Sequence, residues 1–158
     1  MAREAILKKI IMFLCGFALS GLVEAGDKNL EDFAKSYFKA WQTSQSPNAS
    51  KKDLEHYLSF LADDVGHQHL PYDPDDSRSP EGKEQFRKGM TYYLGTHTSY
   101  EAKLDKVVTG HNVIVITYST SSSGKHAHTG QVINQSYDTM EVLEIDKEKV
   151  SVIRKYSK

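Results

Sequence analysis

Cysteine is almost absent from the sequence. The 158 residues contain one cysteine, Cys15, and it lies in the first apolar segment of the chain. The remainder of the chain has no disulfide or thiolate chemistry, so an ordinary hydrophobic core must hold its fold. A glycine-rich phosphate-binding loop and a nucleophile elbow are also missing. These absences argue against phosphate-loop nucleotide binding and against serine or cysteine nucleophilic catalysis.

An excess of charge of one sign is also lacking. The chain has 20 lysine and arginine residues against 21 aspartate and glutamate residues, which gives a formal net charge of −1. A nucleic-acid-binding protein needs a basic stripe, which this sequence does not have, so we expect no nucleic-acid partner. A second long hydrophobic run is missing after the first 25 residues. We therefore expect no membrane segment once that first part is removed.

The first 25 residues have the pattern of a cleavable signal peptide. A basic start, "MAREAILKK", precedes the apolar run "IIMFLCGFALSGLV" at residues 10–23, and "VEA" provides the small residues that signal peptidase recognises. A short membrane anchor is the alternative, but a spanning helix needs about 20 apolar residues. We predict cleavage after Ala25, export to the periplasm or the medium, and a single domain over residues 26–158.

Helical periodicity dominates the first part of this domain. One apolar face runs from Leu30 to Trp41 at the i, i+3, i+4, i+7 spacing. A capping box, Ser50 to Asp53, opens a second helix with four inward residues. These are Leu54, Tyr57, Leu58 and Leu61. A third helix is predicted to begin at Ser79 and Pro80, with Phe86, Met90, Tyr93 and Leu94 on one side.

The period changes from helical to alternating after Thr98. Four strands are predicted at residues 100–105, 112–121, 137–145 and 149–157, with tight turns at "TGHN" and "DKEK" and a longer loop at "SSSGKHAHTG". Helices followed by an antiparallel meander indicate an α+β fold, with the helices on one face of a curved antiparallel sheet.

Four segments, in this order, resemble the nuclear transport factor 2-like superfamily and its SnoaL-like group. They are "FAKSYFKAWQTSQ", "YLSFLADDVGHQH", "PEGKEQFRKGM" and "MEVLEIDKEKVSVIRKY". The resemblance implies a cone, in which a bent sheet wraps the N-terminal helices around a pocket at the open end, and a homodimer formed through the outer sheet face. It also implies isomerase, cyclase or dehydratase chemistry in some members. One departure is Glu148, which stands where the family hairpin has glycine.

Strand alternation predicts the direction of Glu141. Residues 139, 141, 143 and 145 share one face, and Leu143 and Ile145 make that face the inward one. A carboxylate on an apolar wall is usable as a general acid or base near neutral pH. The resemblance aligns Glu141 with the acidic residue of SnoaL-like cyclases, where aspartate is typical. The alternative is a Glu141 that faces solvent beside lysines.

Two His-x-His pairs provide further candidate chemistry. His67 and His69 share a strand face with Val65, and we predict them as catalytic partners of Glu141. Together with His126 and His128, they would be the ligands of a zinc or copper site in an alternative interpretation. Pocket lining or plain surface is the third interpretation of these histidines.

Four residues are predicted to contact a ligand, namely Trp41, Asp64, Tyr93 and Tyr118. The sequence therefore predicts an exported protein that binds a small, largely apolar molecule, with proton-transfer catalysis as a further expectation. A non-catalytic binding or interaction module and a metal-binding protein are the alternatives. No cofactor is expected, and a homodimer would cover Met140 and Val142 on the outer sheet face.

Overall fold

The computed structural model describes residues 29–125 and 129–158. The predicted signal peptide, and with it the cleavage after Ala25, lies outside the described residues, as do His126 and His128. Within the described parts, no helix is long and apolar enough to cross a membrane.

Three helices form where the apolar periodicity predicts them. The first is helical over residues 29–44, α2 spans Lys51–Leu58 and α3 spans Gly82–Tyr93. The predicted capping box of α2 is present, because Ser50 Oγ accepts from the backbone N–H of Asp53 and the Asp53 carboxylate accepts from the backbone N–H of Ser50. The capping box thus provides acceptors for two backbone N–H groups at the N-terminus of α2, those of Ser50 and Asp53.

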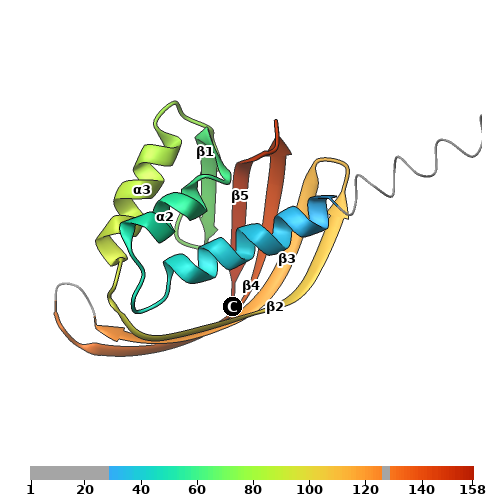
Figure 1. The fold of residues 1–158 in the computed structure, drawn as a ribbon. Helices are drawn as coiled ribbons and strands as arrows, with labels where there is room; N and C mark the ends of the chain where they lie inside the picture. The colour runs from blue at the N-terminus through green and yellow to red at the C-terminus, as the bar shows by residue number, and fades with distance from the viewer. Residues whose placement is uncertain (1–28, 126–128) are drawn as a thin grey trace, which may run out of the picture.

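Five strands form one curved sheet (Figure 1). Their bounds are β1 Leu61–Leu70, β2 His97–Gly110, β3 Val113–Lys125, β4 Val132–Asp146 and β5 Lys149–Ser157. The order across the sheet is β1-β5-β4-β3-β2, with β1 parallel to β5 and the other pairs antiparallel. The predicted α+β fold with a curved sheet is confirmed, and β1 makes the sheet mixed.

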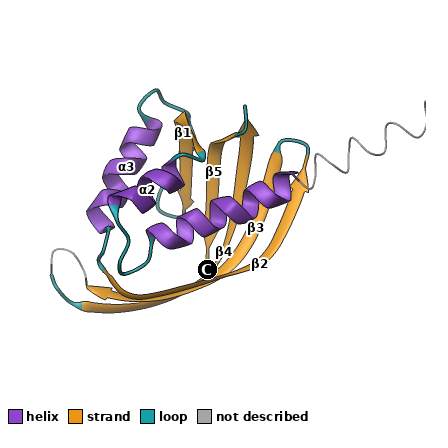
Figure 2. Ribbon diagram, viewed as in Figure 1, coloured by secondary structure: helices purple, strands orange, loops and turns teal. Residues whose placement is uncertain are grey.

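The helices lie on one side of this sheet. Figure 2 shows the N-terminal helix crossing the concave side, with α2 and α3 beside the β1 end. The core lies between these layers and consists of aromatic and aliphatic side chains from the first helix, α2 and the inward faces of the strands. Its largest fully buried members are Tyr37, Tyr57, Tyr118, Leu54, Leu58, Leu61, Ile114, Ile116, Leu143, Ile153 and Val150.

Predicted boundaries differ from the structure at several places. Strand β2 is longer than predicted at both ends, and β4 begins at Val132 rather than at Tyr137. The second helix ends at Leu58, and Leu61 is buried as the first residue of β1 rather than as part of a helix. The third helix begins at Gly82, and Ser79 does not cap it. Strand β3 continues through Ser121 to Lys125 into the predicted loop, because β4 offers it a pairing partner along this whole length.

Gly82 explains why α3 starts where it does. A Cβ atom at Gly82 would lie 2.2 Å from the carbonyl oxygen of Val65, so only glycine lets the helix begin directly against the backbone of β1. This close approach sets α3 over the inward side chains of β1. The ring of Phe86, one turn further along α3, consequently lies 4.7 Å from the ring of His67.

Candidate functional site

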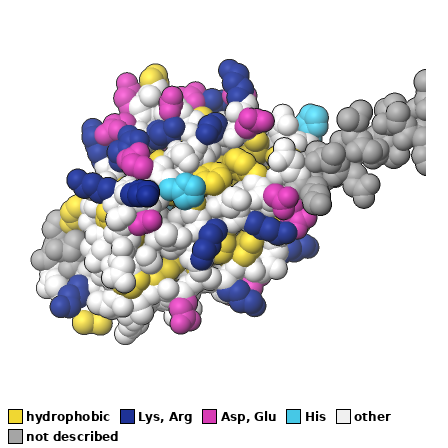
Figure 3. Space-filling view, viewed as in Figure 1, with side chains coloured by type: hydrophobic (Ala, Val, Ile, Leu, Met, Phe, Trp, Pro, Cys, Tyr) yellow, Lys and Arg dark blue, Asp and Glu magenta, His cyan; other side chains and the backbone are white. Residues whose placement is uncertain are grey.

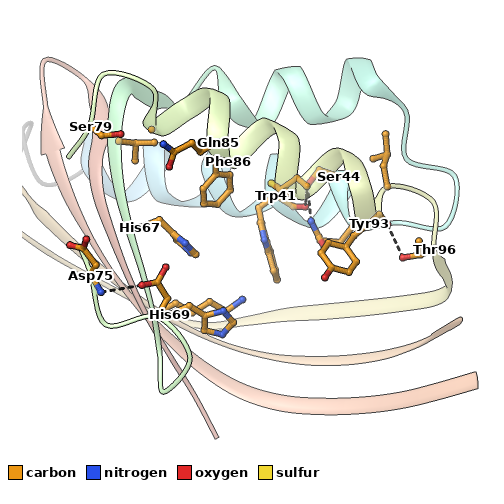
Figure 4. Close-up of a pocket in the computed structure, with 18 of the residues that line it drawn as sticks. Trp41, Ser44, His67, His69, Asp75, Ser79, Gln85, Phe86, Tyr93 and Thr96 are labelled. Atoms are coloured by element: carbon orange, nitrogen blue, oxygen red, sulfur yellow. Dashed lines mark hydrogen bonds between the residues drawn. The ribbon is translucent and has the colours of Figure 1, made fainter. Parts of the chain in front are cut away.

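A pocket of about 730 Å³ lies between α3, the end of the first helix and the concave side of the sheet. Its apolar wall comes from Trp41, Phe86, Met90 and Leu94. Its polar part includes His67, His69, Lys155, Asp73 and Asp75. Figure 4 shows the two imidazoles projecting from β1 toward the side of the pocket where Phe86 and Trp41 lie. The volume is within the range of about 300–1,000 Å³ that is typical of small-molecule sites.

Strand alternation sets the direction of both histidines. Val65, His67 and His69 all line the pocket, which confirms that they share one face of β1. The two rings are 6.2 Å apart, and His67 stands perpendicular to Phe86. Within residues 29–125 and 129–158, no hydrogen bond reaches a ring nitrogen of either histidine. Both imidazoles therefore keep a free donor and a free acceptor for a ligand.

The environment keeps both imidazoles neutral. Burial lowers the pKa of His67 to about 4, and the nearby rings and charges of His69 and Lys155 act in the same direction. Burial also lowers the pKa of His69, with Lys155 as the second cause, while Asp73 opposes the shift in each case. A neutral imidazole donates one hydrogen bond and accepts another, which suits recognition of a ligand carbonyl or hydroxyl group.

Lys155 is the cation of this pocket. It is half-buried on β5, and its register partners are His69 on β1 and Glu141 on β4. Its Nζ lies 5.5 Å from the centroid of the Trp41 ring, within range of a cation–π contact. The lysine therefore extends from the sheet toward the aromatic wall of the pocket.

Glu141 faces inward but is not part of the pocket wall. The side chain is 4% exposed, and its carboxylate accepts hydrogen bonds from the hydroxyls of Tyr118 at 2.7 Å and Tyr37 at 3.3 Å. Tyr57 extends this cluster through a 3.1 Å hydroxyl contact with Tyr37. Burial and the charge of Glu141 raise the pKa of Tyr37, Tyr57 and Tyr118, so all three phenols remain protonated donors.

The structure brings together some of the predicted site residues and separates others. His67, His69, Trp41 and Tyr93 line the same pocket, with Tyr93 61% exposed at its surface. Tyr118 belongs to the tyrosine cluster around Glu141, where its ring lies 4.9 Å from Trp41.

Asp64 lies outside the pocket wall. Its carboxylate accepts a 2.8 Å hydrogen bond from Arg78, which also approaches Asp146. Figure 3 shows acidic and basic side chains interspersed over α2 and α3, where Arg87 pairs with Glu55. Asp64 therefore belongs to the charged outer surface rather than to the wall of this pocket.

Lys155 and Phe86 are pocket residues whose role the sequence did not reveal. Phe86 was expected only on the inward side of its helix. The signal for Lys155 was present in strand alternation, because Ile153 is buried and residue 155 shares its face. Without the register of β5 against β1, the sequence predicts that a lysine near the end of the chain is exposed to solvent.

Metal ligands do not gather in the described parts of the chain. Across residues 29–125 and 129–158, no group of three or more histidine, cysteine, aspartate or glutamate side chains is placed to hold a metal ion. The second His-x-His pair, His126 and His128, falls on residues that the structure does not describe.

Known structures with this fold are numerous, although no protein-family model and no curated protein sequence matches the chain. A SnoaL-like polyketide cyclase from Shewanella denitrificans has a TM-score of 0.64 at 10% identity, over 81% of this chain and 89% of that chain. A nuclear transport factor 2-like protein from Anabaena variabilis has a TM-score of 0.61 at 16% identity, over 80% and 87%. An LEH-like epoxide hydrolase from M. tuberculosis has a TM-score of 0.59 at 13% identity, over 84% and 85%.

These similarities confirm the resemblance at the level of the fold. The chain has the nuclear transport factor 2-like fold, and SnoaL-like proteins are among its structural neighbours. At such low sequence identity the similarity establishes the fold alone. Any chemistry must be inferred from the residues of the pocket.

Proposed function

We propose that the protein binds a small, largely apolar molecule in the pocket between α3 and the concave side of the sheet. The observation that carries this proposal is the pairing of an apolar wall with two neutral imidazoles that have no hydrogen-bond partner in the described chain. The wall residues Trp41, Phe86 and Met90 provide contact area, and His67 and His69 fix the orientation of a polar group.

The chemistry that we assign to this site is proton transfer of the isomerase, cyclase or dehydratase type. His67 is the better hydrogen-bond donor to a ligand oxygen, because it stays neutral throughout the physiological pH range. His69 is less buried and is the better proton acceptor. Glu141 acts as a positioning residue through Tyr118, whose ring packs on Trp41.

Non-catalytic ligand binding is the second candidate function. A general base works best when its pKa is near the operating pH, and that of His67 is far below it. A binding protein would use the same pocket and would lack turnover. Turnover separates the two functions, because only a catalytic protein would convert a bound ligand and lose that conversion when His69 is replaced.

We also propose that the mature protein is exported and forms a homodimer. Val108, Val113 and Met140 are exposed by 47%, 37% and 39%, and strand register places them on the face opposite Glu141. A second copy would cover them. An N-terminus at Gly26 in exported protein supports the first part, and a monomer at micromolar concentration overturns the second.

The binding proposal is tested with a neutral fluorescent probe. Trp41 is the only tryptophan and lines the pocket, so energy transfer from it to bound N-phenyl-1-naphthylamine reports binding at this site. Met90→Glu should weaken probe binding at least about 10-fold, because it puts a charge into the apolar wall. Thr91→Glu, at an exposed position of α3 outside the pocket wall, is the matched control and should leave the affinity unchanged. Equal effects of the two variants, or no energy transfer at all, would overturn the proposal.

A further inference from the structure

We propose that the ligand of this pocket carries a carboxylate group, which Lys155 binds as its counter-ion. This inference rests on the proposed function and names the class of molecule: an acid with an apolar body. Among the described residues, Lys155 is the one lysine or arginine that lines the pocket. It is half-buried there, and a half-buried ammonium group gains more from an ion pair than an exposed one.

Lys155 has no ion pair in the described chain, whereas the nearby cations Arg154 and Lys83 do. Arg154, the preceding residue, is held by Asp76 and Glu144 at 2.6 Å each on the other face of β5. Lys83 on α3 pairs with Asp63 at 2.6 Å. The ammonium group of Lys155 instead lies over the face of the Trp41 ring. Arg154 and Lys83 are therefore paired with carboxylates of neighbouring elements, whereas Lys155 is unpaired and lines the pocket.

The carboxylates near Lys155 already have other hydrogen-bond partners. Glu141 is its register partner on β4, but the two carboxylate oxygens of Glu141 accept from Tyr118 and Tyr37. Asp73 and Asp75 also line the pocket, and each accepts a backbone N–H within its own loop, at 3.2 Å and 2.9 Å. These carboxylates keep their charge, but among the described residues none of them forms an ion pair with Lys155, so its ammonium group is open to a carboxylate that the protein does not supply.

The two histidines complete a carboxylate site of single charge. His69 is the register partner of Lys155 on β1, so the two side chains project from the same face of adjacent strands. A carboxylate at Lys155 has a second oxygen available for an imidazole N–H, and hydrogen bonds to charged oxygens are the strong ones. One cation and two neutral donors match a monoanion, and the apolar body of the acid would then pack between Trp41 and Phe86.

The test compares an acid with its neutral counterpart. 4-Phenylbutyrate and 4-phenylbutanol share a carbon skeleton, and their affinities are measured by titration calorimetry at pH 7.5 and low salt with the wild-type protein. We expect the acid to bind about 10-fold more tightly than the alcohol. Lys155→Met should remove this preference by weakening the acid alone, and Lys155→Arg should keep it. Lys52→Met, at an exposed lysine of α2 outside the pocket, is the matched control and should change neither affinity.

Each outcome decides the proposal. Equal affinities of the wild-type protein for the acid and the alcohol would overturn the carboxylate inference and leave the proposed function in place. An equal loss of affinity for the two compounds in Lys155→Met would have the same consequence. If neither compound binds and N-phenyl-1-naphthylamine shows no energy transfer from Trp41, the proposed function fails as well. Unchanged near-ultraviolet circular dichroism of Lys155→Met establishes that a loss of acid binding is not a loss of fold.

Discussion

The hydroxyl of Tyr118 donates a 2.7 Å hydrogen bond to Oε1 of Glu141 in the interior of the protein. Tyr118 is 1% exposed and Glu141 is 4% exposed, so water does not replace this contact. A buried carboxylate is costly unless hydrogen-bond donors surround it. The phenols of Tyr118 and Tyr37 therefore make the burial of Glu141 possible, and the strength of this arrangement is measurable.

Tyr118→Phe should lower the free energy of unfolding by about 2 kcal/mol, because hydrogen bonds to charged groups contribute roughly 1.5–3 kcal/mol. Urea unfolding at pH 7.5 measures the change. Tyr100→Phe is the matched control: its ring is also near the charge of Glu141, but its hydroxyl makes no hydrogen bond within the described chain. Similar losses in the two variants would contradict a specific role for the contact between Tyr118 and Glu141.

Two glycines of α3 should respond in opposite directions to the same substitution. A Cβ at Gly82 would lie 2.2 Å from the carbonyl oxygen of Val65, whereas nothing lies within 4 Å of a Cβ at Gly89. Gly82→Ala should therefore cost about 2–3 kcal/mol of stability through overpacking. Gly89→Ala should add up to about 1 kcal/mol through helix propensity. Thermal and urea unfolding measure both, and a loss at Gly89 equal to that at Gly82 would contradict the close approach of α3 to β1.

Local patterns were sufficient to predict the helices, most strands and the face of β1 that carries the histidines. Alternation in β1 needs only sequence spacing, so Val65, His67 and His69 were correctly placed together. The inward direction of Glu141 followed in the same way from Leu143 and Ile145, which share its face of β4. Neither inference depends on which strands are neighbours.

Which residues line the pocket could not be predicted from local sequence patterns, because it depends on the pairing of strands that are far apart in the sequence. Glu141 faces inward, yet the first helix and β3 place Tyr37 and Tyr118 over its carboxylate. Lys155 enters the site because β5 pairs in parallel with β1, and this register joins residues that are 86 positions apart at His69 and Lys155. Strand order and register are set by the packing of the whole domain.

The hairpin between β4 and β5 contains strain that a glycine should relieve. Lys147 and Glu148 have φ of 49° and 60°, a left-handed conformation that costs a residue with a Cβ about 1 kcal/mol. Glu148→Gly should therefore raise the free energy of unfolding by about 1 kcal/mol. The same substitution at Glu101, on the exposed face of β2, should lower it by about 0.5–1 kcal/mol. Destabilisation by Glu148→Gly, measured by urea unfolding, would contradict the turn geometry.

The buried imidazole of His67 should make stability depend on pH in a defined window. Burial lowers its pKa from 6.5 to about 4 in the folded protein, so between these values the unfolded chain binds more protons than the folded chain. The free energy of unfolding should therefore fall as the pH is lowered from about 7 to about 4, and His67 accounts for up to about 3 kcal/mol of that fall. Urea unfolding across this range should show a shallower slope for His67→Gln than for the wild type. NMR titration provides the direct measurement, and a His67 imidazole that titrates near pH 6.5 in the folded protein would contradict its burial against Phe86.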